Sequence, residues 1–384
     1  MKKYITLFSL FIGQGFIGTV ISLLTLTSIL VGRNLAPSPK LASFPITVTV
    51  IGTFVMIYFA AIMMSKYGRK NAFLFSGIIG LIGSIIAIIA IYKSNFILFL
   101  FSMFLIGNTI SFNQYYRFAA AEVFDDIIWK RRSTSIVIGG GVLGGILGPF
   151  LAKNGEFFID GYPFLGNFIF LLLVFILFIF SQNFIFLKEI KKKKIEEKNN
   201  KINYDSSFLV GTLSCTVAFF LMTLIMNSAP LSMYNNHYSM ENNALAIQVH
   251  FLAMYIPSFF ISFILNKIKK TYIILFGIFS FLFGSILSFV FSGYMGYFFP
   301  LMFSGLGWAL MFSGGTYYIN EISSSKKHKL QGLNSIIIYS FNVLSSFLVG
   351  ILLSYENGWI NLNYITIFVC ILFILLLFFL KEKE

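Results

Sequence analysis

Apolar runs, each long enough to cross a bilayer at about 20 residues, follow one another along almost the whole chain. This feature constrains the fold more than any other. The chain is 58% hydrophobic and only 11% charged, whereas soluble domains carry about 25% charged residues. The pattern predicts an all-α polytopic membrane protein. Its twelve expected transmembrane helices cover about residues 5–30, 45–64, 71–92, 96–120, 134–152, 163–187, 207–230, 244–265, 272–293, 296–319, 331–354 and 358–380.

Basic residues are distributed unevenly between the loops. An even number of spans puts both termini on one side, and twenty-three of the 28 lysines and arginines fall on that side. Because cytoplasmic loops carry an excess of Lys and Arg, we expect a multi-pass protein of the cytoplasmic (inner) membrane with both termini cytoplasmic. This placement accounts for the net charge of +14 without a nucleic-acid partner.

Landmarks in the first half of the chain recur in the second half. Lys66 and Lys267 lie in corresponding loops 201 residues apart, and Glu122 and Glu321 follow corresponding spans 199 residues apart. The two nearly equal offsets indicate a duplication, a pattern typical of transporters built from parallel repeats. The expected parts are an N-terminal six-helix bundle, a lysine-rich cytoplasmic linker and a C-terminal six-helix bundle, at residues 1–187, 188–206 and 207–384.

The loop between the second and third spans contains Gly68, Arg69 and Lys70. With the six-plus-six topology and the basic central loop, these residues make the whole chain resemble the major facilitator superfamily. The loop motif of that family reads Gly-x-x-x-Asp-x-x-Gly-Arg-Lys/Arg. Ala61 and Ser65 stand here where the motif has its first glycine and its acid. The resemblance implies a two-bundle fold that carries a solute by alternating access.

The resemblance also implies an inner gate. In the family, basic residues of this loop pair with an acid at the foot of span four. We therefore predict that Arg69 pairs with Glu122, Asp125 or Asp126 in the outward-open state. The alternative is that Arg69 only contributes to the positive-inside charge. The expected gating residues are Gly68, Arg69, Lys70, Glu122, Asp125 and Glu321.

An arginine lies late in the fourth apolar run, at Arg117. Because a charge inside the bilayer costs at least about 2.5–3.5 kcal/mol, Arg117 is expected to face a protein interior. Asn113 shares its helical face, four residues earlier. Two interpretations follow. Arg117 binds an anionic or carbonyl-bearing solute through its planar guanidinium, or it lies near the cytoplasmic end and pairs with Glu122 or the lipid interface as a structural charge.

Other polar side chains occur within the apolar runs, where each serves either as a solute ligand or as a contact between helices. The resemblance implies a central cavity among spans one, four, seven and ten, with contributions from five, eight and eleven. His250, the one histidine within a span, takes part either in proton coupling or in a structural hydrogen bond. Trp308 packs either on a ring-shaped solute or in the core. The expected substrate-binding residues are Gln14, Asn113, Gln114, Arg117, Asn227, Gln248, His250, Tyr318, Tyr339 and Asn342.

The fifth run contains glycines at three- and four-residue spacing between Gly139 and Gly148, followed by Pro149. Such spacing lets helices approach closely. The pattern also resembles a span-five motif associated with exporters of the family, although residues 150–152 replace its trailing glycine pair. We expect close packing at this span.

These observations predict a secondary transporter that moves a small organic solute, such as a metabolite, vitamin or drug-like molecule, by alternating access. The alternatives are a polytopic membrane enzyme acting on lipid and a passive channel. An enzyme needs a nucleophile–base set or a metal cluster, and three histidines with Cys215 and Cys370 offer little. We expect no enzymatic activity, no cofactor and no metal. We expect a monomer in the lipid bilayer, in which the absence of a mid-span acid weakens a proton-driven mechanism.

Overall fold

The structure, a computed structural model, describes residues 1–187, 206–264, 268–321 and 327–381 and is all-helical. Of the expected linker at 188–206, only Ser206 lies within the described residues. The elements are α1 (Lys2–Leu35), η1 (Pro39–Leu41), α2 (Phe44–Tyr92), α3 (Phe96–Asn113), α4 (Tyr116–Glu122), α5 (Ile127–Gly139), α6 (Gly141–Gly155), α7 (Leu165–Gln182), α8 (Ser206–Asn235), α9 (Met240–Ile264), α10 (Lys270–Val290), α11 (Met295–Glu321), α12 (Lys327–Leu353) and α13 (Gly358–Lys381).

Among the described residues, 11 helical segments are long and apolar enough to cross a membrane. They follow the expected spans, except that α2 continues for 49 residues through two of them. A helix of that length extends about 75 Å, more than twice the thickness of a hydrocarbon core. At Gly68 the backbone of α2 leaves the helical region, with φ of 80° and ψ of 163°. Glycine adopts this conformation without the steric penalty of a side chain, so the kink lies between the two expected spans.

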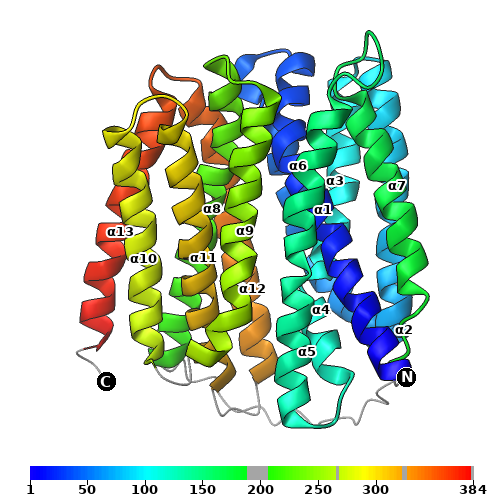
Figure 1. Ribbon diagram of the computed structural model, residues 1–384, viewed down its shortest axis with the longest axis vertical. Helices are drawn as coiled ribbons and strands as arrows, with labels where there is room; N and C mark the ends of the chain where they lie inside the picture. Colours follow the sequence, from blue (N-terminus) through cyan, green and yellow to red (C-terminus); the bar gives the residue numbers. More distant parts are fainter. Residues whose placement is uncertain (188–205, 265–267, 322–326, 382–384) are drawn as a thin grey trace.

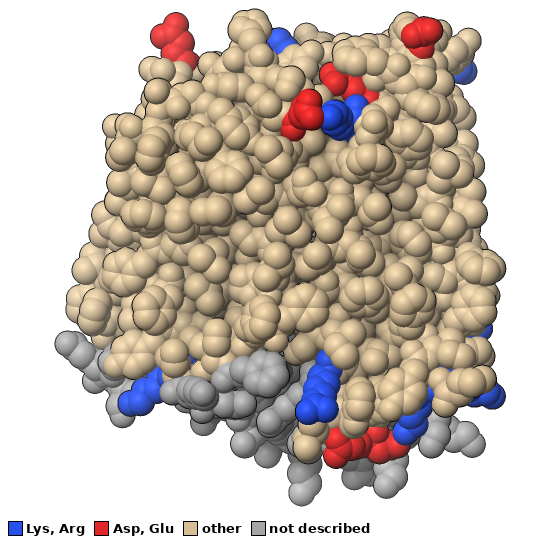
Figure 2. All heavy atoms as spheres, in the orientation of Figure 1, with Lys and Arg blue, Asp and Glu red and all other residues tan. Residues whose placement is uncertain are grey.

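The helices stand side by side, with α1–α7 on the right and α8–α13 on the left in Figure 1. The chain begins α1 and ends α13 at the same end of the molecule, which we call the terminus end (Figure 1). On the face shown in Figure 2, charged residues gather at the two ends and an apolar band lies between them. This is the surface that a bundle of membrane-crossing helices presents to lipid.

Helix α6 packs closely on α1 because small residues meet at the contact. Gly144 lies against the backbone of Gly18, so that a methyl group added at Gly144 would collide with main-chain atoms of α1. The Ser22 hydroxyl donates a hydrogen bond of 2.7 Å to the carbonyl oxygen of Gly144. Backbone atoms of the two helices therefore approach without an intervening side chain.

A second face of α6 packs on α9. Gly141 and Gly145, one turn apart, lie against the side chains of Tyr255 and Phe251. Helix α6 belongs to the first half of the chain and α9 to the second, so the glycines let α6 fill the space between the halves. The close packing expected for this span is confirmed.

Three polar contacts between the first half (before residue 188) and the second half (after residue 205) lie at the end opposite the termini. The contacts there are the ion pair of Lys153 with Glu241 at 2.6 Å, the hydroxyls of Thr47 and Ser346 at 3.2 Å, and the guanidinium of Arg33 at 4.7 Å from the ring centre of Tyr234. The described ion pairs at the terminus end join residues of the first half to each other. We call the first group the closed-end contacts.

Replacing Gly144 with alanine is expected to destabilise the protein, because the new methyl group meets the backbone of Gly18 rather than a flexible side chain. Overpacking of this kind costs about 1–3 kcal/mol. The matched control is Gly332→Ala on α12, where an added methyl meets no atom within 4 Å and helix propensity favours alanine. Thermal unfolding midpoints in detergent measure both; equal midpoints for the two variants would contradict the close approach.

Candidate functional site

The fourth expected span is interrupted one turn before Arg117. Helix α3 ends at Asn113 and α4 begins at Tyr116. The amide of Tyr115 bonds to the carbonyl of Phe112 at 3.0 Å, a tighter turn than an α-helix makes. Arg117 therefore lies on the first turn of a short new helix inside a membrane-crossing segment.

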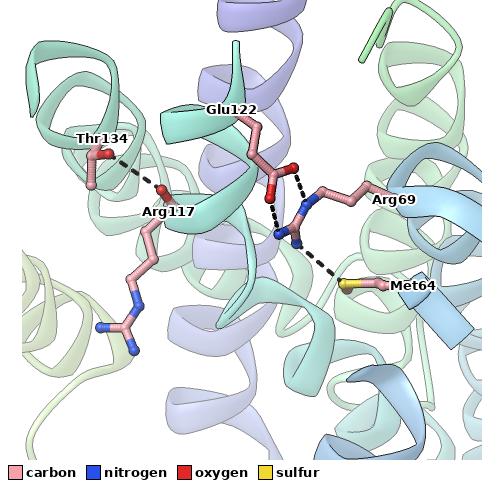
Figure 3. Close-up of polar contacts among 5 residues, drawn as sticks. All are labelled: Met64, Arg69, Arg117, Glu122 and Thr134. Carbon is pink, nitrogen blue, oxygen red and sulfur yellow. Dashed lines mark hydrogen bonds and ion pairs between the residues drawn. The ribbon is translucent and has the colours of Figure 1, made fainter. Parts of the chain in front are cut away.

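The side chain of Arg117 points away from Glu122 and Arg69 (Figure 3). Both oxygens of the Glu122 carboxylate are bound by the Arg69 guanidinium. The interpretation that Arg117 pairs with Glu122 is therefore wrong. The main-chain carbonyl of Arg117 accepts a hydrogen bond from Thr134 at 3.3 Å, which ties α4 to α5.

Arg117 reaches toward the second half of the chain. Its guanidinium carbon lies 4.8 Å from the ring centre of Phe118 and 5.5 Å from that of Phe312 on α11. The thiol of Cys215 on α8 and the hydroxyl of Tyr339 on α12 lie within electrostatic range. The guanidinium thus faces a protein interior, as the sequence predicts, and not the lipid.

Aromatic rings from four helices gather next to this guanidinium. We call Phe219, Tyr255, Trp308, Phe312 and Tyr339 the aromatic cluster; they come from α8, α9, α11, α11 and α12. Trp308 stacks on Phe312 with ring centres 4.9 Å apart and planes at 12°. Phe219 lies 5.4 Å from Trp308, 5.3 Å from Phe312 and 6.0 Å from Tyr339, and Tyr255 lies 6.4 Å from Trp308.

Polar atoms near or within this region are enclosed but lack hydrogen-bond partners. The Nε atom of Arg117 and the indole Nε1 of Trp308 are buried donors without a partner. Elsewhere among the described residues, the Oδ1 atoms of Asn113 on α3 and Asn227 on α8 are also buried acceptors without a partner. Buried polar groups are normally paired, so unpaired donors beside stacked rings are the arrangement expected where a solute completes the bonding.

Of three other predicted ligands, one lies next to Arg117 and two lie at contacts between helices. The side chain of Gln114 lies against the Tyr339 hydroxyl, within the Arg117 region. Asn342 accepts a hydrogen bond of 2.5 Å from Thr223 and so joins α12 to α8. Gln14 is buried on α1 against Gly140, at the junction of α5 and α6.

His250 and Tyr318 make contacts between helices. The Nδ1 atom of His250 lies 2.7 Å from the carbonyl oxygen of Leu301; because a carbonyl only accepts, Nδ1 carries the hydrogen. The Tyr318 hydroxyl lies 2.7 Å from that of Thr271 on α10. Gln248 is half-buried on α9. The structural interpretation therefore fits His250 and Tyr318 better than direct contact with a solute at Arg117.

Arg69 pairs with Glu122, one of the acids expected at the foot of span four; the outward-open state in which we expected this pair stays a prediction. Arg69 Nε and Nη2 donate to the two carboxylate oxygens of Glu122 at 2.5 Å each, and Nη1 lies 3.6 Å from the Met64 sulfur (Figure 3). The pair forms while the closed-end contacts are in place. The Lys70 ammonium donates to the carbonyl of Asn183 at 2.7 Å. Glu321 ends α11, but its side chain lies outside the described part.

Asp125 pairs with a residue that the sequence reasoning missed. The Lys3 ammonium at the start of α1 lies 2.9 Å from its carboxylate. The aromatic cluster was also missed, apart from Trp308 and Tyr339. Phenylalanines are frequent in every apolar run, so spacing alone does not separate rings that face the centre from rings that face lipid.

No family model matches the chain. The riboflavin transporter RfnT of Brucella anthropi is 28% identical over 368 residues, which cover 92% of this chain and 90% of that protein. Two Bacillus subtilis proteins described as uncharacterized MFS-type transporters are also similar. YddS is 25% identical over 262 residues (63% of this chain, 59% of YddS), and YdeG is 23% identical over 365 residues (87% and 82%).

The fold is that of a solved transporter. The crystal structure of the human organic anion transporter MFSD10 (TETRAN) aligns with 96% of this chain and 99% of its own, with a TM-score of 0.68 and 11% sequence identity. Similarity at this level concerns the arrangement of helices.

Replacing Arg69 with alanine is expected to lower the free energy of unfolding by no more than about 1 kcal/mol, because the pair with Glu122 lies near the surface. Lys66→Ala is the control: it removes an equal charge from the same loop, where the described contact of Lys66 is the Tyr67 ring at 5.2 Å. The exchanged variant Arg69→Glu with Glu122→Arg recovers the loss. Thermal unfolding measures all three variants. If Arg69 only contributes to the positive-inside charge, Lys66→Ala and Arg69→Ala would have the same unfolding midpoint.

Proposed function

Because the chain is a transporter of the major facilitator superfamily that moves a small organic solute, we propose that it works by alternating access between two six-helix bundles at residues 1–187 and 207–384. The bundles rock about a solute site between them, as in transporters built from repeats. The closed-end contacts support this proposal because the described ion pair between the halves, Lys153 with Glu241, lies at one end of the molecule. The related proteins are named as transporters, which supports neither a lipid enzyme nor a passive channel.

In this proposal twelve helices cross the cytoplasmic membrane and α2 crosses twice, turning at Gly68. The length of α2, 49 residues, supports two crossings. The basic residues near the terminus end, such as Arg69 and Lys70, support cytoplasmic termini. The carrier is a monomer in which Arg69 and Glu122 hold α2 to the foot of span four as part of the inner gate.

We propose a planar heteroaromatic solute, with riboflavin as the first candidate. The observation that carries this is the stacked pair of Trp308 and Phe312 beside Arg117, with the indole Nε1 and the Arg117 Nε left without hydrogen-bond partners. A flat ring gains from stacking, and its carbonyl groups accept hydrogen bonds from such donors. The name of RfnT, a riboflavin transporter 28% identical to this chain, supports the same choice.

The proposal gives His250 no proton-carrying role. Its Nδ1 is committed to the carbonyl of Leu301, and Ser304 lies 3.2 Å from the same atom. A histidine held in this way joins α9 to α11.

Vesicles containing the protein are expected to exchange labelled riboflavin for unlabelled riboflavin across the membrane. Trp308→Ala removes the stacking surface and is expected to weaken this counterflow about tenfold, since tenfold corresponds to about 1.4 kcal/mol. Trp129→Ala, at the foot of α5 and outside the aromatic cluster, is the matched control. Counterflow of equal strength in both variants would contradict the ring-binding site, and absence of counterflow in the parent would exclude riboflavin.

A disulfide at the closed end is expected to arrest transport. Thr47→Cys with Ser346→Cys, placed in a Cys215→Ser, Cys370→Ser background, puts two thiols where hydroxyls lie 3.2 Å apart. Oxidation locks the closed-end contacts and stops counterflow, and reduction restores it. Each single cysteine variant is the control, and continued transport by the oxidised double variant would contradict alternating access.

A further inference from the structure

Arg117 carries a charge that no acidic side chain balances in the described part of the chain. The groups whose electrostatic effect reaches its guanidinium are the Cys215 thiol and the hydroxyls of Tyr339 and Tyr115. None of these is a carboxylate. Its Nε atom is enclosed and makes no hydrogen bond, and two aromatic rings lie within 5.5 Å of the guanidinium carbon.

The acids that lie nearest along the chain are already engaged. Glu122 accepts both of its bonds from Arg69, on the other side of α4 from the Arg117 side chain (Figure 3). Asp125 pairs with Lys3. A charge held between helices without an opposite charge is costly, because it has lost part of its hydration and gained no ionic partner in return. Among the described residues, Arg117 is therefore a half-buried cation without an acidic partner.

The cation–π contacts do not replace this partner. The rings attract the cation through their faces, but they offer no hydrogen-bond acceptor in the plane of the guanidinium. That plane is the part of arginine that matches a carboxylate, through two parallel N–H donors. The missing component is thus an anionic acceptor that lies edge-on to Arg117 and flat against the aromatic cluster.

We propose that the solute itself supplies the missing charge, and that Arg117 makes the carrier select aromatic carboxylates over neutral aromatic molecules of the same shape. This inference deepens the proposed function and rests on its solute site. A neutral flavin engages the same donors through its ring carbonyls. A carboxylate forms charge-assisted bonds, which are roughly twice as strong, and also cancels the half-buried charge.

The test uses purified full-length protein in detergent and three pairs of acid and amide: nicotinate with nicotinamide, indole-3-acetate with indole-3-acetamide, and 10-carboxymethylflavin with its amide. A ligand that binds the folded state raises the unfolding midpoint. We expect at least one acid to act at a concentration about tenfold or more below that of its amide, equivalent to about 1.4 kcal/mol. Arg117→Gln abolishes this preference. Arg132→Gln, which removes an exposed cationic residue of α5 that contacts the Trp129 ring, retains it.

A second readout needs no ligand. Without ligand, Arg117→Gln is expected to raise the unfolding midpoint, because it removes a half-buried charge that has no acidic partner among the described residues. Arg69→Gln is expected to lower the midpoint by breaking the pair with Glu122. A lower midpoint for Arg117→Gln would show that the charge is balanced within the protein and would overturn the proposal.

Three ligand results would also overturn it: amides that act as well as acids, an acid preference that survives Arg117→Gln, or no effect of any acid. These results are separate from the riboflavin experiment. Failure of riboflavin counterflow with an intact acid preference would reject the flavin and keep the charge selection. Riboflavin counterflow without an acid preference would keep the flavin and reject the charge selection.

Discussion

The bilayer sets the constraint on which the structure depends: a charge inside it has to be enclosed by protein or balanced. Arg117 is enclosed. The break between α3 and α4 turns its side chain toward Phe312 and away from Glu122. Arg69 occupies the one acid on the same short helix, so the two arginines of this region have different surroundings. Arg69 is paired with a carboxylate near the surface, whereas Arg117 has no acidic partner among the described residues. The candidate site follows from that difference.

The glycines of α6 let this centre lie between the two halves. Gly144 brings α6 against α1, and Gly141 brings the same helix against Tyr255 of α9, a member of the aromatic cluster. Larger side chains at these positions would move α9, and with it one edge of the cluster, away from the first half. The same glycines of α6 therefore allow the close packing on α1 and hold the aromatic cluster next to the first half.

Much of the scaffold could be predicted from hydropathy, because each span must be apolar over a fixed length. The inward direction of Arg117 also followed from the cost of exposing a charge to lipid, and the Arg69 pairing followed from a recognisable loop. The aromatic cluster could not be predicted, since Phe219 and Phe312 look like any other phenylalanine in an apolar run. The break between α3 and α4 could not be predicted either. We expected Asn113 and Arg117 to share one helical face, but the backbone hydrogen bonding changes between them.

The closed-end pair of Lys153 and Glu241 has side chains 44% and 68% exposed, so dissolved ions reach it readily. Ions screen exposed charges over a Debye length of about 8 Å at physiological ionic strength. The ion pairs Lys3–Asp125 and Arg69–Glu122 hold a single half together and do not resist its separation from the other. Salt on the face opposite the termini thus weakens the ion pair that joins the halves. At the terminus end, salt weakens the two described ion pairs, which lie within one half.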